Sequence, residues 1–199
     1  NNNHIKKMFK ENWLSLGLAE INNKKNTSLE LDEIIDLSFK SGIKMFDVAP
    51  NYYEGNAEKS IGNYIIKKSI KDLSIITKVG QLSNSEIYFR NKKHNVDDLT
   101  YFNFTPDYVK KSILRSLNNL NKKNIECVLI HNPEDAVNSK HSIYNLLSKI
   151  IPVLEEFCRE KKIRCWGISS WSGFNSLSDD KTLFNIFELQ EYIDNYWNN

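Results

Sequence analysis

The chain has 199 residues, of which 40% are hydrophobic and 26% are charged, and its formal net charge is +2. This length and composition predict a single globular domain, residues 1–199, with a sizeable core. The nearly balanced charge gives no electrostatic case for nucleic acid or an anionic membrane as a partner. No apolar run approaches the length of a membrane span, and the opening residues, NNNHIKK, lack the apolar core of a signal peptide.

The cysteines indicate a reducing compartment. Cys127, Cys158 and Cys165 form no CxxC pair, and an odd number without metal-ligand spacing favours reduced thiols in a cytoplasm. We expect these thiols to be inert packing residues, and we expect no metal site. The first residue is Asn1 and not Met, which is compatible with a start inside a longer chain.

Short apolar runs alternate with amphipathic stretches along the chain. The first helix is expected to begin at a capping box of Thr27 and Glu30 and to end at Gly42. A further helix is expected to begin at Thr105 and Pro106. The apolar runs predict six strands, at residues 13–19, 44–48, 73–79, 126–130, 164–168 and 184–190.

Two other helices are expected, at residues 58–68 and 143–160, and Pro152 must kink or restart the second of them. Residues 81–105 show no clean period and are rich in Asn, Ser and Lys, so we interpret them as a long loop that could act as a lid. Lys92, Lys93 and His94 in this stretch are expected to form a solvated surface.

Strands that alternate with helices predict parallel βαβ units. No GxGxxG motif follows the first strand, so a Rossmann dinucleotide fold has little support. The α/β pattern fits a (β/α)8 TIM barrel better. Such barrels typically have about 250 residues and eight strands, and this chain supplies only about the first six βα units, so we expect a barrel that is incomplete at the C-terminus.

In four successive predicted strands, the last inward-facing side chain is polar. Asp47, Lys78, His131 and Ser169 each lie at the carboxyl end of a strand, and Tyr52 follows Asp47 by five residues. Because side chains alternate along a strand and neighbouring strands lie roughly 4.8 Å apart, the first three should converge around Tyr52. Active sites of barrels lie at this end, whereas Trp166 has the opposite phase and should face the helices. Trp171, just past its strand, could line a substrate pocket.

This set of side chains suits the reduction of a carbonyl group. A lysine ammonium beside a tyrosine favours the ionised phenol, which makes the tyrosine a better proton donor to a developing alkoxide. Asp47 would keep Lys78 charged and oriented, and His131 could hydrogen-bond a carbonyl oxygen. Tyr52 would then be the general acid, with hydride from a cofactor. In reverse, the same set would oxidise an alcohol or a sugar hemiacetal.

Five motifs in chain order resemble those of the aldo-keto reductase family, and the resemblance covers nearly the whole chain. They are Asp47-Val48-Ala49 with Tyr52, Glu58 with Ile61 and Gly62, Thr77-Lys78, Ile130-His131-Asn132-Pro133, and Lys162-Ile163-Arg164 with Gly167-Ile168-Ser169.

The resemblance implies a catalytic tetrad of Asp47, Tyr52, Lys78 and His131. It also implies that Ser169 and Ser170 contact the nicotinamide carboxamide of NADPH or NADH, although Ser170 stands where the family more often has asparagine. Gln190 resembles the glutamine of the family's sixth strand, which implies that it binds the cofactor. The partner would be a small-molecule carbonyl compound or sugar. The HNPED run at 131–135 is weakly similar to members that act on sugars or pyridoxal-like alcohols.

Three functions stay open at this point. The leading hypothesis is an NAD(P)H-dependent reductase of aldehydes or ketones, and the second is an NAD(P)-dependent aldose dehydrogenase with the same fold. The third is a non-catalytic binding protein on a reductase-like scaffold. In the family, the seventh and eighth strands carry the adenosine-phosphate contacts. We therefore expect these 199 residues alone to bind NADPH very weakly or not at all, and to be aggregation-prone or oligomeric. The substrate and the oligomeric state are left open.

Overall fold

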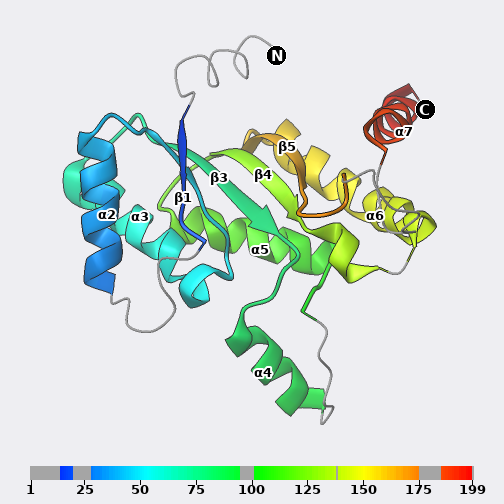
Figure 1. Cartoon of the computed structure of the whole chain (residues 1–199), viewed down its shortest axis with the longest axis horizontal. Helices are drawn as coiled ribbons and strands as arrows, with labels where there is room; N and C mark the ends of the chain where they lie inside the picture. The colour runs from blue at the N-terminus through cyan, green and yellow to red at the C-terminus, as the bar shows by residue number, and fades with distance from the viewer. Residues whose placement is uncertain (1–13, 20–27, 95–100, 138, 175–184, 199) are drawn as a thin grey trace.

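The fold is built on a parallel sheet of five strands in the order β1-β2-β3-β4-β5 (Figure 1). The computed structural model describes residues 14–19, 28–94, 101–137, 139–174 and 185–198. The strands are β1 (Ser15–Gly17), β2 (Met45–Asp47), β3 (Ser74–Val79), β4 (Ile125–His131) and β5 (Ile163–Ser169). Each pairs in parallel with its sequence neighbour, which confirms the predicted βαβ order for the first five strands.

Helices connect successive strands and cover one face of the sheet (Figure 1). They are α2 (Ser28–Lys40), α3 (Asn56–Lys68), α5 (Pro106–Asn119) and α6 (Lys140–Arg159). Pro152 lies inside α6 on its exposed side, and the helix continues through it without a restart. Gly42 follows α2 with a φ of +91°, as a helix stop requires. The predicted cap at Thr27 lies outside the described residues.

The two faces of the sheet differ in burial. Phe46, Ile75 and Val128 point toward the helices and are fully buried. Residues of the other row, such as Ile76, Leu129 and Gly167, are half-buried. The core therefore lies between sheet and helices, while the concave row that ends in the predicted site residues is less covered.

The expected loop at 81–105 contains a helix, α4 (Asn84–His94), so that prediction was wrong. Ser83 and Glu86 form a capping box at its start. The Ser83 amide donates to Glu86 Oε2 at 2.9 Å, and the Glu86 amide donates to Ser83 Oγ at 3.3 Å. The serine–glutamate spacing was visible in the sequence, but the helix lacks the apolar period that reveals a buried face. Lys92 and Lys93 are exposed, as expected.

The prediction of a sixth strand at 184–190 was also wrong, because residues 186–190 lie in helix α7 (Ile186–Asn198). Asn185 Oδ1 accepts hydrogen bonds from the amides of Phe187 and Glu188 at 2.9 and 3.4 Å, which caps the helix. Leu189 is buried, and Tyr192 donates to the Tyr144 carbonyl on α6 at 3.1 Å. The apolar residues thus follow a helical period. None of the described helices combines the length and apolar character needed to cross a bilayer.

Candidate active site

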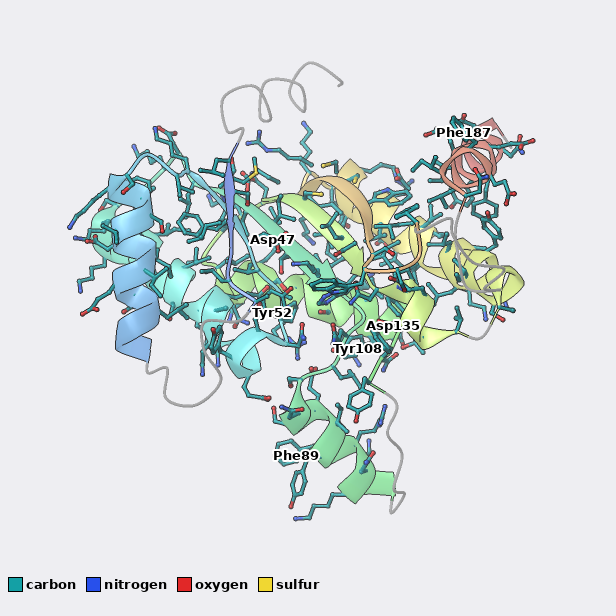
Figure 2. The ribbon with its side chains drawn as sticks, in the orientation of Figure 1. Asp47, Tyr52, Phe89, Tyr108, Asp135 and Phe187 are labelled. Atoms are coloured by element: carbon teal, nitrogen blue, oxygen red, sulfur yellow. The ribbon has the colours of Figure 1, made fainter. Side chains whose placement is uncertain are left out.

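Four side chains from three strand ends and one turn meet on the concave side of the sheet. Asp47 ends β2, Lys78 is the penultimate residue of β3, and His131 ends β4. Tyr52 begins the short 3-10 turn Tyr52–Gly55 that follows β2. Figure 2 shows Asp47 and Tyr52 near the middle of the molecule, beside the strand ends. The structure therefore brings together the four residues that the sequence predicted as a set.

Lys78 lies at the centre of this cluster and is almost fully buried. Its Nζ forms an ion pair with Asp47 Oδ1 and donates to the Val48 carbonyl at 3.0 Å. The same ammonium lies 4.8 Å from the centre of the Tyr52 ring. A buried ammonium is costly unless charged or polar partners compensate it. Asp47, whose side chain is 31% exposed, supplies that charge from the solvent side.

His131 also packs against the tyrosine. The rings of Tyr52 and His131 meet edge to face, with centroids 5.9 Å apart and planes at 79°. Burial, and then the positive charge of Lys78, lower the pKa of His131 from 6.5 to about 3. The imidazole is therefore neutral at physiological pH, so one ring nitrogen carries a proton and the other accepts.

The loops after β4 and β5 are bound to each other through Glu134. This residue lies three positions after His131 and is 3% exposed. Its Oε1 accepts from Ser170 Oγ at 2.6 Å and from the amides of Trp171, Ser172 and Gly173 at 2.9, 3.2 and 3.4 Å. The predicted nicotinamide contact Ser170 is therefore already engaged, and Glu134, which the sequence did not single out, orders its loop.

Several buried acceptors around the cluster lack a hydrogen-bond donor among the described residues. They are Asn51 Oδ1, immediately before Tyr52, and Asn132 Oδ1 and Glu134 Oε2, one and three residues after His131. Buried polar atoms are normally paired. A carboxamide NH2 group is a donor of the kind that these oxygens lack. The residues present therefore fit a nicotinamide at the ends of β4 and β5, where Ser169 also lies.

Two further residues lie elsewhere than the sequence suggested. Gln190 is in helix α7 and not at a strand end, is exposed, and donates to Asp194 Oδ1 at 2.8 Å. Trp171 is 86% exposed, so in this structure it does not close a pocket. Trp166 does face the helices, as expected, and its Nε1 donates to Glu155 on α6.

Glu58 has a structural place beside the cluster. It is fully buried on α3, where it accepts from Thr77 Oγ1 at 2.7 Å and from Asn119 Nδ2 at 3.0 Å. Because Thr77 precedes Lys78, this carboxylate joins α3, β3 and α5 behind the ammonium. The glutamate of the second motif therefore supports the site from the helix side.

The fold and the cluster define an α/β-barrel type of protein with an ionisable site at the carboxyl ends of its strands. The model of the aldo/keto reductase family matches residues 13–182. The chain belongs to the aldo/keto reductase family.

Two curated relatives have known activities. The chain is 28% identical over 145 residues to a D-threo-aldose 1-dehydrogenase from Pseudomonas sp, which covers 69% of this chain and 43% of that protein. It is 26% identical over 140 residues to the NADH-specific methylglyoxal reductase of Escherichia coli K12. This match covers 70% of this chain and 40% of that protein. The chain therefore spans less than half the length of these relatives.

Solved structures agree on the fold. An aldo-keto reductase from Bacillus halodurans, in its holo form, superposes with a TM-score of 0.60 at 22% identity, over 79% of this chain and 45% of that one. An aldo-keto reductase from Klebsiella pneumoniae in complex with NADPH superposes with a TM-score of 0.54 at 18% identity, over 79% of this chain and 45% of that one. At these identities the likeness concerns the fold, and it confirms a (β/α)8-type architecture of which five strands are described.

Proposed function

We propose that this protein is an NAD(P)H-dependent oxidoreductase that reduces an aldehyde or ketone to an alcohol, with Tyr52 as general acid. The observation that carries the proposal is the Lys78 ammonium, which lies 4.8 Å from the Tyr52 ring and is ion-paired with Asp47. A positive charge held beside a phenol favours the phenolate that remains after proton transfer. Family membership supports the same chemistry.

Each residue of the cluster has a distinct role in this proposal. Tyr52 donates its hydroxyl proton to the carbonyl oxygen as negative charge develops there. Neutral His131 donates an N–H to the same oxygen and orients it, while Lys78 stabilises the phenolate. Asp47 keeps Lys78 in place. The nicotinamide, when bound, supplies the hydride.

Ser169 and the unpaired acceptors Asn132 Oδ1 and Glu134 Oε2 would hold the carboxamide of the nicotinamide. Ser170 acts through its hydrogen bond to Glu134, which keeps the loop in position. Gln190 remains a proposed cofactor contact from the family resemblance alone. Either NADPH or NADH could be the hydride donor, since one curated relative is named as NADH-specific and one solved neighbour is a complex with NADPH. The three free cysteines support a cytoplasmic setting.

A second function, oxidation of a sugar hemiacetal by the same residues, is favoured by the likeness to the Pseudomonas aldose dehydrogenase. In that direction Tyr52 would act as the base. The two functions are separated by assaying sugars with NAD+ or NADP+ and aldehydes with NADH or NADPH. A non-catalytic scaffold is the alternative that would show neither reaction.

The test substitutes Tyr52 with phenylalanine, which keeps the ring and removes the proton. Because the chain spans 43% of the Pseudomonas relative, we would use an extended chimera, in which this chain is continued by the C-terminal part of that relative. Carbonyl reduction should fall about 10²–10⁴-fold, the usual size of a general-acid effect. Tyr101→Phe, at a tyrosine that is 49% exposed, is the matched control and should leave turnover unchanged. Near-normal turnover in Tyr52→Phe would remove Tyr52 from the mechanism.

A further inference from the structure

The turn that carries Tyr52 has an unfavourable backbone conformation. Tyr53 and Glu54, the next two residues, have φ angles of 50° and 57° and lie in the left-handed region. Residues other than glycine adopt this region at a cost in free energy, so the surrounding structure must hold them there. The position of Tyr52 therefore depends on contacts that fix this turn from outside.

Glu54 makes such contacts with helix α4. Its Oε1 accepts from the Asn84 amide at 3.1 Å, and its Oε2 accepts from the Ser85 amide at 3.1 Å and from Ser85 Oγ at 2.6 Å. The amides belong to the first turn of α4, where they have no partner within the helix. Burial acts to raise the pKa of Glu54, but the bonds from Ser85 and Asn84 outweigh it and hold that pKa below 4.5.

Helix α4 is in turn fixed to the body on another side. Glu86 Oε1 accepts from Tyr108 Oη at 3.0 Å and from Arg115 Nη1 at 2.7 Å, both on α5. A backbone hydrogen bond also joins the chain before α4 to the chain before α5: the Asn103 amide donates to the carbonyl of Gly80 at 2.7 Å. Gly80 lies two residues after Lys78. Although α4 stands off the main body in Figure 1, its first turn is anchored, so it can serve as a fixed support.

We propose that Glu54 is a positioning residue for Tyr52, and that the first turn of α4 is the support to which it binds the Tyr52 turn. Through Glu54, the first turn of α4 sets where the phenol lies relative to Lys78 and His131. The catalytic consequence rests on the proposed function, in which Tyr52 gives the proton. The competing explanation is that Glu54 caps α4 and has no effect on Tyr52.

The test compares Glu54→Ala and Glu54→Gln with the control Glu33→Ala, at an exposed glutamate on α2. Amide hydrogen exchange of the 199-residue protein is followed by mass spectrometry in peptides that cover residues 52–55 and 84–86. Loss of the cap should raise exchange in both peptides by about tenfold, since several hydrogen bonds are lost together. Glu54→Gln keeps one side-chain acceptor, so it should rescue part of the protection.

A second readout follows the phenol itself. Tetranitromethane nitrates tyrosines, and fragmentation of the peptide separates Tyr52 from Tyr53. The rate at Tyr52 should change in Glu54→Ala and return toward the wild-type rate in Glu54→Gln. In the extended chimera, Glu54→Ala should lower kcat about tenfold with little change in KM, because the proton donor and not the substrate is displaced.

Three outcomes decide between the explanations. Faster exchange in both peptides together with an altered nitration rate at Tyr52 supports the positioning role. Faster exchange confined to residues 84–86, with Tyr52 unaffected, reduces Glu54 to a helix cap and overturns it. A chimera without carbonyl reduction, in which Tyr52 still responds to Glu54→Ala, overturns the proposed function and leaves the link between Glu54 and Tyr52 supported.

Discussion

The neutral imidazole of His131 is the residue-scale feature with a direct consequence for pH. Its pKa falls from 6.5 to about 3 in the folded protein, so between these values an unfolded chain binds a proton that the folded chain does not. The contribution of His131 to the free energy of unfolding should therefore be fully present above pH 6.5. It should decrease as the pH falls below 6.5, by up to about 1.4 kcal/mol per pH unit.

Urea denaturation between pH 5 and pH 7.5 measures this slope. His131→Gln should lose that part of the pH dependence while keeping the part due to carboxylates, which titrate mainly at lower pH. An identical slope in wild type and variant would show that His131 is readily protonated in the folded protein. In that case it could not act as the neutral donor proposed for catalysis.

The ion pair of Lys78 and Asp47 predicts strong coupling between the two residues. Lys78→Met leaves a carboxylate without its partner, and Asp47→Asn leaves a buried ammonium. Because Asp47 is 31% exposed, we expect each change to lower the free energy of unfolding by about 1–3 kcal/mol, less than for a fully buried pair. The double variant should lose less than the sum. Additive losses in a double-mutant cycle would show that the two side chains act independently.

At the residue scale, alternation along the strands was enough to predict which polar side chains meet. Asp47, Lys78 and His131 lie where their strand phase placed them, because a buried strand leaves little freedom in side-chain direction. Glu54 and Glu134 were not found this way. They act across loops, where the sequence carries no period and the partners are backbone amides that every residue has.

At the scale of elements, Gly80 allows the residues just before α5 to pack closely against the end of β3. This residue has a φ of +110°, and a Cβ on it would collide with the ring of Phe104. Gly80→Ala should therefore lower the free energy of unfolding by about 1–3 kcal/mol, from the clash and the left-handed backbone together.

The contributions of clash and backbone can be separated with a second substitution. Phe104→Ala in the Gly80→Ala background should restore the part due to the clash and leave the part due to φ. Thermal or urea unfolding of the two single variants and the double variant measures both parts. If Gly80→Ala is as stable as the wild type, the close approach of Phe104 to β3 is not a constraint on the fold.

Most of the elements that the sequence predicted correctly have a buried face. The strands β2 to β5 and the helices α3, α5 and α6 have apolar residues at fixed spacing, and their expected positions differ from the observed ones by a few residues. Helix α4 is mostly exposed, so only its capping box could have revealed it. The sequence predicts a strand at the start of α7 because a short apolar run fits either the strand or the helix period.

At the scale of the whole molecule, the order of elements determined the fold class before any side-chain contact was known. Alternating strands and helices leave few topologies other than a parallel sheet with right-handed crossovers. The number of strands could not be predicted as well, because the sixth depended on one ambiguous segment. Family membership rests on motifs that occupy the strand ends, which is where the fold brings distant residues together.

The sheet has two free edges among the described residues, which predicts self-association of a protein of these 199 residues. No described strand pairs with the outer side of β1 or of β5. Six of the seven residues of β5 retain solvent exposure. Unpaired edge amides and carbonyls are a template for strand pairing with other chains, and β5 is long enough for several such bonds, whereas β1 has three residues.

We therefore expect sedimentation velocity of the 199-residue protein to show dimers or larger species whose proportion rises with concentration. The extended chimera is the control. Its added strands can cover β5, so it should sediment as a single monomeric species. Hydrogen exchange gives the location of the contact. The β5 amides that do not bond to β4 should be protected in the associated form and exposed on dilution. A 199-residue protein that stays monomeric at all concentrations would contradict this prediction and show that the edge of β5 does not drive association.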